Sequence, residues 1–173
     1  MSIVSVEKDY EGLALVLVAD FDAPIERVWE LWADPRQLER WWGPPTHPAT
    51  VEKHDLAAGG EVAYFMTGPE GERSRGWWRV TSVAPPRSLE FTDGWANQDG
   101  TPKTGLPTTA VRVRLTEQDG RTRMVLRFRF DSGEYMEQLE RWGAFELFPQ
   151  SVGQMDALLA ADITTAAPED RTT

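Results

Sequence analysis

The chain reads LALVLVADFDAPIERVWELW over residues 13–32, and this stretch passes directly from a strand pattern into a helix pattern. Leu13–Phe21 is an apolar run with interspersed valines that is too short for a typical core helix, which predicts a strand. Asp22 is a plausible helix N-cap, and Pro24 suits the helix start. Apolar residues then recur at helical spacing, at Ile25, Val28, Trp29 and Trp32. The stretch therefore predicts a strand followed at once by a short helix.

A second short helix and a run of strands are predicted downstream. The helix starts at Asp34-Pro35, because the residue before a proline is steered away from the helical conformation and Asp34 can cap the next turn. The predicted strands are one ending at His54, followed by Glu61–Met66, Arg75–Val83, Ser88–Asp93, Ala110–Thr116 and Met124–Phe130. In the last two, apolar residues alternate with arginines, which is typical of a sheet with one apolar and one hydrated face. Their order predicts an antiparallel meander of about six or seven strands.

A long C-terminal helix is predicted from Ser132 to Ala161, where a serine cap precedes apolar residues at helical intervals. Pro149 lacks an amide donor, so we expect the helix to kink or restart there. Residues 164–173 are expected to be disordered, which leaves a single domain over residues 1–163. Because the sheet must cover its apolar face, the elements predict an α+β fold in which a curved antiparallel sheet wraps the C-terminal helix.

Composition and charge exclude several classes of protein. The 173 residues suffice for one core. A net charge of −10 argues against a nucleic-acid partner, which would require a basic surface. The chain has no cysteine, no secretory signal pattern and no apolar run of 18 residues. We therefore expect a cytoplasmic protein without disulfides, thiolate chemistry or a membrane partner.

Eight tryptophans are the unusual feature of the composition. Each aromatic ring can bury about 150–250 Å², so this many indoles suggest rings that line a cavity, although simple packing in a solid core is the alternative. Strand alternation selects Tyr64, Met66, Trp78 and Phe128 as candidate ligand-binding residues, and the apolar side of the C-terminal helix adds Met136, Leu139 and Trp142. Trp42, His47 and Trp95 complete the set of candidates. His47 would act as a hydrogen-bonding anchor.

No catalytic residue, metal site or cofactor is predicted. His47 and His54 lack the spacing and the further ligands that a zinc site needs, and His54 and Asp55 point to opposite faces of a strand. The chain has no nucleophile elbow of a serine hydrolase. Its paired glycines fit neither a phosphate loop nor a dinucleotide fingerprint.

Six arginines, which we call the arginine stripe, are predicted on the outer face of the last two strands: Arg112, Arg114, Arg121, Arg123, Arg127 and Arg129. They form either a hydrated face paired with Glu90 or Glu117, or a docking surface. Such a surface would bind an acidic partner or a second copy of the chain, which would make a homodimer.

Several stretches carry a family resemblance: Phe21–Trp29, Asp34-Pro35 with Trp41–Pro44, Asp55–Gly60, Ser82–Thr92, and Glu140–Glu146 with Gln150 and Met155–Leu159. Together they resemble the bacterial homologues of the activator of heat-shock-protein-ninety ATPase, within the START-like (SRPBCC) superfamily. The resemblance covers about residues 13–160 and implies the helix-grip fold, with a ligand cavity between the sheet and the C-terminal helix. Pro149 and the polar stretch Gly94–Pro107 depart from the family pattern. We expect no counterpart of the client-binding domain of the eukaryotic activator, so a co-chaperone role is not carried over.

Three functions follow as hypotheses. The preferred one is binding of a small hydrophobic or aromatic molecule, for sequestration, transport or tolerance. The second is a polyketide-cyclase-like or hydratase-like enzyme that uses the same cavity, which a buried His47, Tyr64 or carboxylate aimed into the cavity would favour. The third is a chaperone-accessory or regulatory interaction module.

Overall fold

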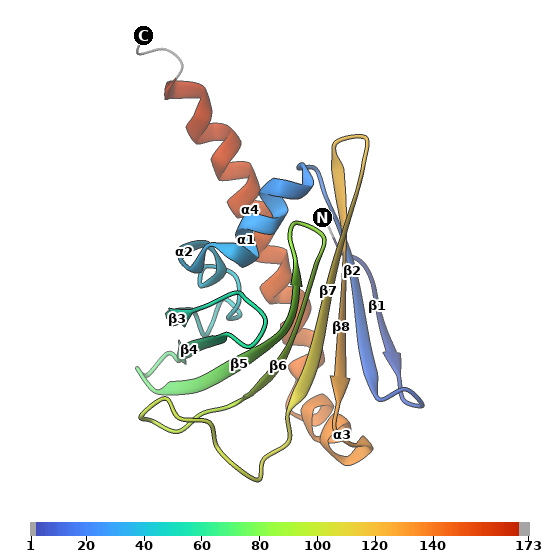
Figure 1. The fold of residues 1–173 in the computed structure, drawn as a ribbon, viewed down its shortest axis with the longest axis vertical. Helices are drawn as coiled ribbons and strands as arrows, with labels where there is room; N and C mark the ends of the chain where they lie inside the picture. Colours follow the sequence, from blue (N-terminus) through green and yellow to red (C-terminus); the bar gives the residue numbers. More distant parts are fainter. Residues whose placement is uncertain (1–2, 170–173) are drawn as a thin grey trace.

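The computed structural model describes residues 3–169 and contains an eight-stranded antiparallel sheet that curves around a long helix (Figure 1). The strands are β1 (Ile3–Asp9), β2 (Ala14–Phe21), β3 (Ala49–His54), β4 (Glu61–Thr67), β5 (Arg73–Ala84), β6 (Ser88–Trp95), β7 (Thr109–Gln118) and β8 (Arg121–Phe130). Their order in the sheet is β1-β2-β8-β7-β6-β5-β4-β3. The helices are α1 (Ile25–Ala33), α2 (Pro35–Leu38), α3 (Gly133–Arg141) and α4 (Ala144–Glu169). This confirms the predicted α+β helix-grip architecture.

The sheet has eight strands where six or seven were expected. The additional strand is β1, which pairs with β2 from Asp9 opposite Ala14 to Ile3 opposite Ala19. Most of its side chains are exposed, because it lies at the edge of the sheet and contributes little to the core. Without a buried face, its sequence carries no apolar alternation from which the strand could be recognised.

The inner face of the sheet supplies the core through regular alternation. Leu15 and Leu17 on β2 lie opposite Phe128 and Leu126 on β8, and all four are buried. On β7, Val111, Val113 and Leu115 are buried while the residues between them are exposed. The predicted separation of an apolar face from a hydrated face is therefore confirmed for β7 and β8.

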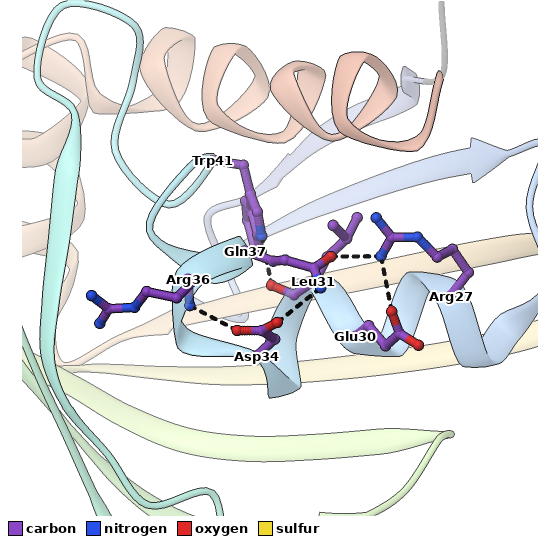
Figure 2. Close-up of polar contacts among 7 residues, drawn as sticks. All are labelled: Arg27, Glu30, Leu31, Asp34, Arg36, Gln37 and Trp41. Carbon is purple, nitrogen blue, oxygen red and sulfur yellow. Dashed lines mark hydrogen bonds and ion pairs between the residues drawn. The ribbon is translucent and has the colours of Figure 1, made fainter. Parts of the chain in front are cut away.

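The two short helices are joined by side-chain hydrogen bonds (Figure 2). The Asp34 carboxylate accepts from the backbone amide of Arg36 at 2.9 Å and from the Gln37 side chain at 3.0 Å, which confirms Asp34 as the cap of α2. Gln37 in turn accepts from Arg27 of α1 at 2.6 Å. The indole of Trp41 donates to the Leu31 carbonyl at 2.8 Å. These bonds position the segment that carries Trp41 and Trp42 against α1.

The expected cap of α1 was wrong. Asp22 is exposed, and the helix begins after Pro24, which has no side-chain capping bond. The first helical amide, that of Ile25, donates instead to the Glu117 carboxylate of β7 at 2.7 Å. A carboxylate from a distant strand therefore takes the role that a local side chain usually has at a helix N-terminus.

The C-terminal helical region divides at Gly143 and not at Pro149. Ser132 caps α3 by accepting from the Tyr135 amide at 3.1 Å, as predicted. The chain then turns at Gly143, whose φ of +81° is a conformation that favours glycine. Pro149 lies inside α4, which continues to Glu169. Residues 164–169, expected to be disordered, are thus helical, and residues 170–173 lie outside the described residues. None of the described helices is long and apolar enough to cross a membrane.

Candidate ligand-binding cavity

A cavity of about 330 Å³ lies between the inner face of the sheet, helices α3 and α4, and the loop after α2. Aromatic side chains make up much of its wall: Trp41, Trp42, Tyr64, Trp95, Phe128, Tyr135, Trp142 and Phe148. Trp95 and Trp142 are 40% and 58% exposed, which places them at its mouth, whereas Phe128 and Tyr135 are buried. The volume falls at the lower end of the range for small-molecule sites.

Eight of the ten residues predicted to bind a ligand line this cavity: Trp42, His47, Tyr64, Met66, Trp95, Phe128, Leu139 and Trp142. They come from the three strands β4, β6 and β8, from α3, from the end of α3 and from the loop after α2. The helix-grip fold therefore brings together side chains that lie up to a hundred residues apart in the chain. Their contact with a ligand stays a prediction.

The other two candidates do not line the cavity. Met136 is 1% exposed and lies in the core. Trp78 is fully buried and stacks on Phe91 at a ring distance of 3.8 Å. Alternation placed Trp78 correctly on the inner face of β5, but α1 and the segment after α2 bring other rings over that part of the sheet.

Trp78 belongs to an aromatic cluster, formed by Trp32, Trp41, Trp42, Trp78 and Phe91. Trp32 and Trp41 meet edge to face at 4.6 Å, and Trp42 and Trp78 meet in the same way at 4.8 Å. The two interpretations of the tryptophan content, packing in a solid core and lining of a cavity, therefore each apply to some of the rings. Some indoles form solid core, and others line the cavity, with Trp41 and Trp42 doing both.

Asp93 is the site residue that sequence reasoning missed. It lines the cavity and is half-buried, and its carboxylate accepts a hydrogen bond from the Tyr64 hydroxyl at 2.7 Å. Burial raises the pKa of the Asp93 carboxyl to about 7, although the bond from Tyr64 opposes this change. Burial and the neighbouring Asp93 also raise the pKa of Tyr64 well above its ordinary value. The pair is a polar site in a mostly apolar wall.

Two signals in the sequence could have identified this pair. Leu89, Phe91 and Asp93 are alternate residues of one strand, so a carboxylate falls on a face that is otherwise apolar. Gly76 is an isolated glycine inside a strand, which indicates close approach of another group. That group is the Tyr64 ring, because a Cβ atom at Gly76 would lie 2.4 Å from its hydroxyl oxygen.

The remaining polar residues of the wall are mostly engaged. Arg75 forms an ion pair with Glu52 and lies over the Phe65 ring at 5.0 Å. His47 Nδ1 lies 2.8 Å from the Thr46 hydroxyl. His54 is outside the cavity, where its Nε2 atom is 3.1 Å from the Trp32 carbonyl. Among the described residues, no group of three histidines or carboxylates is placed to hold a metal ion.

The arginine stripe is only partly paired. Arg112 binds Glu90 at 2.8 Å, as expected, and Arg123 binds Asp20 through two bonds of 2.8 and 2.9 Å. Glu117 was the alternative partner to Glu90, but its carboxylate caps α1 instead. Arg112 also lies directly opposite Arg127 in the pairing of β7 with β8.

A curved sheet that grips a C-terminal helix, with a cavity enclosed between them, defines the class of START-like helix-grip proteins. Within this class, the chain belongs to the family described as "Activator of Hsp90 ATPase homolog 1-like protein", whose model matches residues 22–160. The resemblance seen in the sequence is therefore confirmed. No curated protein matches the sequence.

Solved structures from several bacteria share the fold. A solution structure of an Arthrobacter aurescens protein has 47% identity and a TM-score of 0.88, covering 92% of this chain and 93% of its own. A crystal structure of a Mycobacterium smegmatis protein has 45% identity and a TM-score of 0.82, covering 91% and 96%. A family member from Silicibacter pomeroyi has 28% identity and a TM-score of 0.68, covering 86% and 99%.

Proposed function

We propose that this protein binds a small hydrophobic or aromatic molecule in the cavity, for sequestration, transport or tolerance. The observation that carries the proposal is the open volume of about 330 Å³ with a predominantly aromatic and aliphatic wall. Filling it would remove apolar surface from water on both sides, which favours binding. Because the chain has no cysteine, which suits a reducing compartment, we further propose that it acts in the cytoplasm.

Isothermal titration calorimetry with 2-naphthalenemethanol, a small neutral aromatic alcohol, tests this proposal. Ser151 lines the cavity from α4 and is buried, so Ser151→Phe should fill the space and abolish binding. Ala157→Phe, on an exposed position of the same helix, is the matched control and should leave binding unchanged. Equal binding by the wild type and Ser151→Phe, or no binding of this or related neutral aromatics by the wild type, would contradict the proposal.

A second candidate function is an enzyme of the cyclase or hydratase kind, and the Asp93–Tyr64 pair favours it. A carboxyl group with a pKa of about 7 can both accept and return a proton near neutral pH, which is what general acid–base catalysis requires. In the step considered, the Asp93 carboxylate would remove a proton from a carbon beside a carbonyl group and leave the electron pair on the substrate.

Hydrogen exchange tests this step directly. The α-protons of 2-tetralone, an aromatic ketone of suitable size, can be followed in D₂O by NMR. The wild type should accelerate their exchange and Asp93→Asn should not. If both proteins give the rate of buffer alone, the enzymatic candidate is rejected and only the binding proposal remains.

A further inference from the structure

Among the residues that the structure describes, the cavity wall has one carboxylate and no cation paired with it. Asp93 is the only acidic side chain among the described residues of the wall. An ionised carboxylate accepts hydrogen bonds at about four lone-pair positions, and the Tyr64 hydroxyl occupies one. An ionised carboxylate without a counter-charge is costly in an apolar site. A cationic ligand that pairs with Asp93 would offset that cost.

The neighbouring residues do not supply that partner. Facing Asp93 are Tyr64 from β4, Trp78 from β5, Thr109 from β7 and Tyr135 from α3, none of which is a cation. Arg75, also in the wall, forms an ion pair with Glu52 and lies over the Phe65 ring, although its buried Nε atom has no hydrogen-bond partner among the described residues. His47, the other basic residue of the wall, lies in the loop after α2, where its Nδ1 atom is 2.8 Å from the Thr46 hydroxyl.

The rings around the cavity favour a cation as well. Trp42, Tyr64, Trp95 and Tyr135 all contribute to the wall, and the faces of such rings attract ammonium groups. Against the effect of burial, the buried indole of Trp78, like the Tyr64 hydroxyl, lowers the pKa of Asp93 by hydrogen bonding and so favours its ionised form. A net charge of −10 raises the concentration of small cations at the surface.

We propose that the cavity selects small aromatic or hydrophobic amines, with the protonated amine hydrogen-bonded to the Asp93 carboxylate and the apolar body against the aromatic wall. This inference rests on the proposed binding function and names the chemical class of its ligand.

Three probes with one naphthalene body separate the charge of the ligand from its apolar surface. They are 2-naphthylmethylamine, 2-naphthalenemethanol and 2-naphthoate, which are a cation, a neutral donor and an anion at neutral pH. In calorimetry at pH 8 the amine should bind at least roughly tenfold more tightly than the alcohol, since a hydrogen bond to a charged group is stronger than one between neutral groups. The naphthoate should bind least.

Substitution of the carboxylate gives the decisive comparison. Asp93→Asn should remove the preference for the amine over the alcohol. Asp119→Asn is the control, because it makes the same change of charge at the β7–β8 turn. Asp119 has a φ of +55°, a conformation that asparagine also adopts readily. This variant should keep the full preference for the amine. Binding of the alcohol by Asp93→Asn shows that the variant is folded, and Tyr64→Phe, which leaves the carboxylate in place, should retain the preference.

The pH dependence gives an independent readout. Because the amine requires an ionised Asp93, its affinity should fall roughly tenfold per pH unit below about 7, while the affinity of the alcohol should change little. Histidine also titrates near this range, so the same series is measured on Asp93→Asn. If the whole pH effect persists there, it belongs to a group other than Asp93 and the inference is overturned.

The outcomes for the two proposals differ. If the alcohol binds and the amine binds no more tightly, the amine inference fails while the binding function stands. If none of the three probes binds, both fail. A preference for the amine that Asp93→Asn removes and Asp119→Asn keeps supports both.

Discussion

Tyr64 and Asp93 lie on strands β4 and β6, which β5 separates, and yet the Tyr64 hydroxyl donates to the Asp93 carboxylate at 2.7 Å. The ring crosses β5 at Gly76, its partner in the strand pairing. The absence of a side chain at one glycine therefore allows two polar groups to meet at the wall of an apolar cavity.

Gly76→Ala should destabilise the protein by about 1–3 kcal/mol, the usual cost of overpacking. The added methyl group would lie 2.4 Å from the Tyr64 Cζ atom and must displace the ring. Urea denaturation measures the cost. In a Tyr64→Leu background the same substitution should cost much less, because the ring is gone; an equal cost in both backgrounds would show that the ring is not the obstacle.

Asp93→Asn should change the pH dependence of stability. The carboxyl titrates near 3.8 in an ordinary environment and near 7 in the folded protein. Between these values the folded state binds the additional proton, so the free energy of unfolding decreases as pH rises, by on the order of 4 kcal/mol across the window. The asparagine variant lacks this contribution.

Denaturation of both proteins at several pH values from 4 to 8 measures the difference. Relative to the wild type, Asp93→Asn should become progressively more stable up to about pH 7, with no further change above that pH. A constant difference over the whole range would mean that Asp93 does not have the raised pKa.

Asp34→Ala should cost about 1 kcal/mol, within the usual range for loss of a helix cap. The carboxylate accepts the Arg36 amide and the Gln37 side chain, and both bonds would be lost. Glu30→Ala is the control, since Glu30 is exposed and its ion pair with Arg27 is 3.4 Å long; it should change stability by less than about 0.5 kcal/mol. Similar values for the two variants would argue against the cap.

Gly153→Ala should stabilise the protein by roughly 0.5–1 kcal/mol, the difference in helix propensity. Gly153 lies within α4, and no atom lies within 4 Å of the position of an added Cβ. Thermal denaturation tests this. Gly143→Ala provides the contrast, because Gly143 has a φ of +81° and alanine there should destabilise.

Much of the fold was predictable because the elements that form the core have strong patterns. Alternation in β7 and β8, the Asp34-Pro35 signal and the Ser132 cap all mark structure locally. What could not be predicted depends on partners distant in sequence. The α1 cap is Glu117, which lies on the distant strand β7. Strand β1 is fixed by backbone pairing with β2 more than by burial of its own apolar residues.

The apolar residues of the cavity wall were predictable, but the polar pair in that wall was not. Side chains such as Phe128 and Leu139 follow from periodicity, because the inner face of the sheet and the apolar face of a helix must meet. Whether an inward ring meets the cavity or other rings depends on what covers it, as Trp78 shows. Asp93 was overlooked because a lone carboxylate near the end of a strand looks like an exposed residue until Tyr64 is seen to reach it.

The aromatic cluster has an optical consequence. Trp42 belongs both to the cluster and to the cavity wall, and its ring lies 4.8 to 6.1 Å from those of Trp41, Trp32 and Trp78. Excitation energy passes readily between indoles at such separations. A molecule that touches Trp42 alone should therefore alter the emission of the connected rings, so the unlabelled protein carries its own sensor of cavity occupancy.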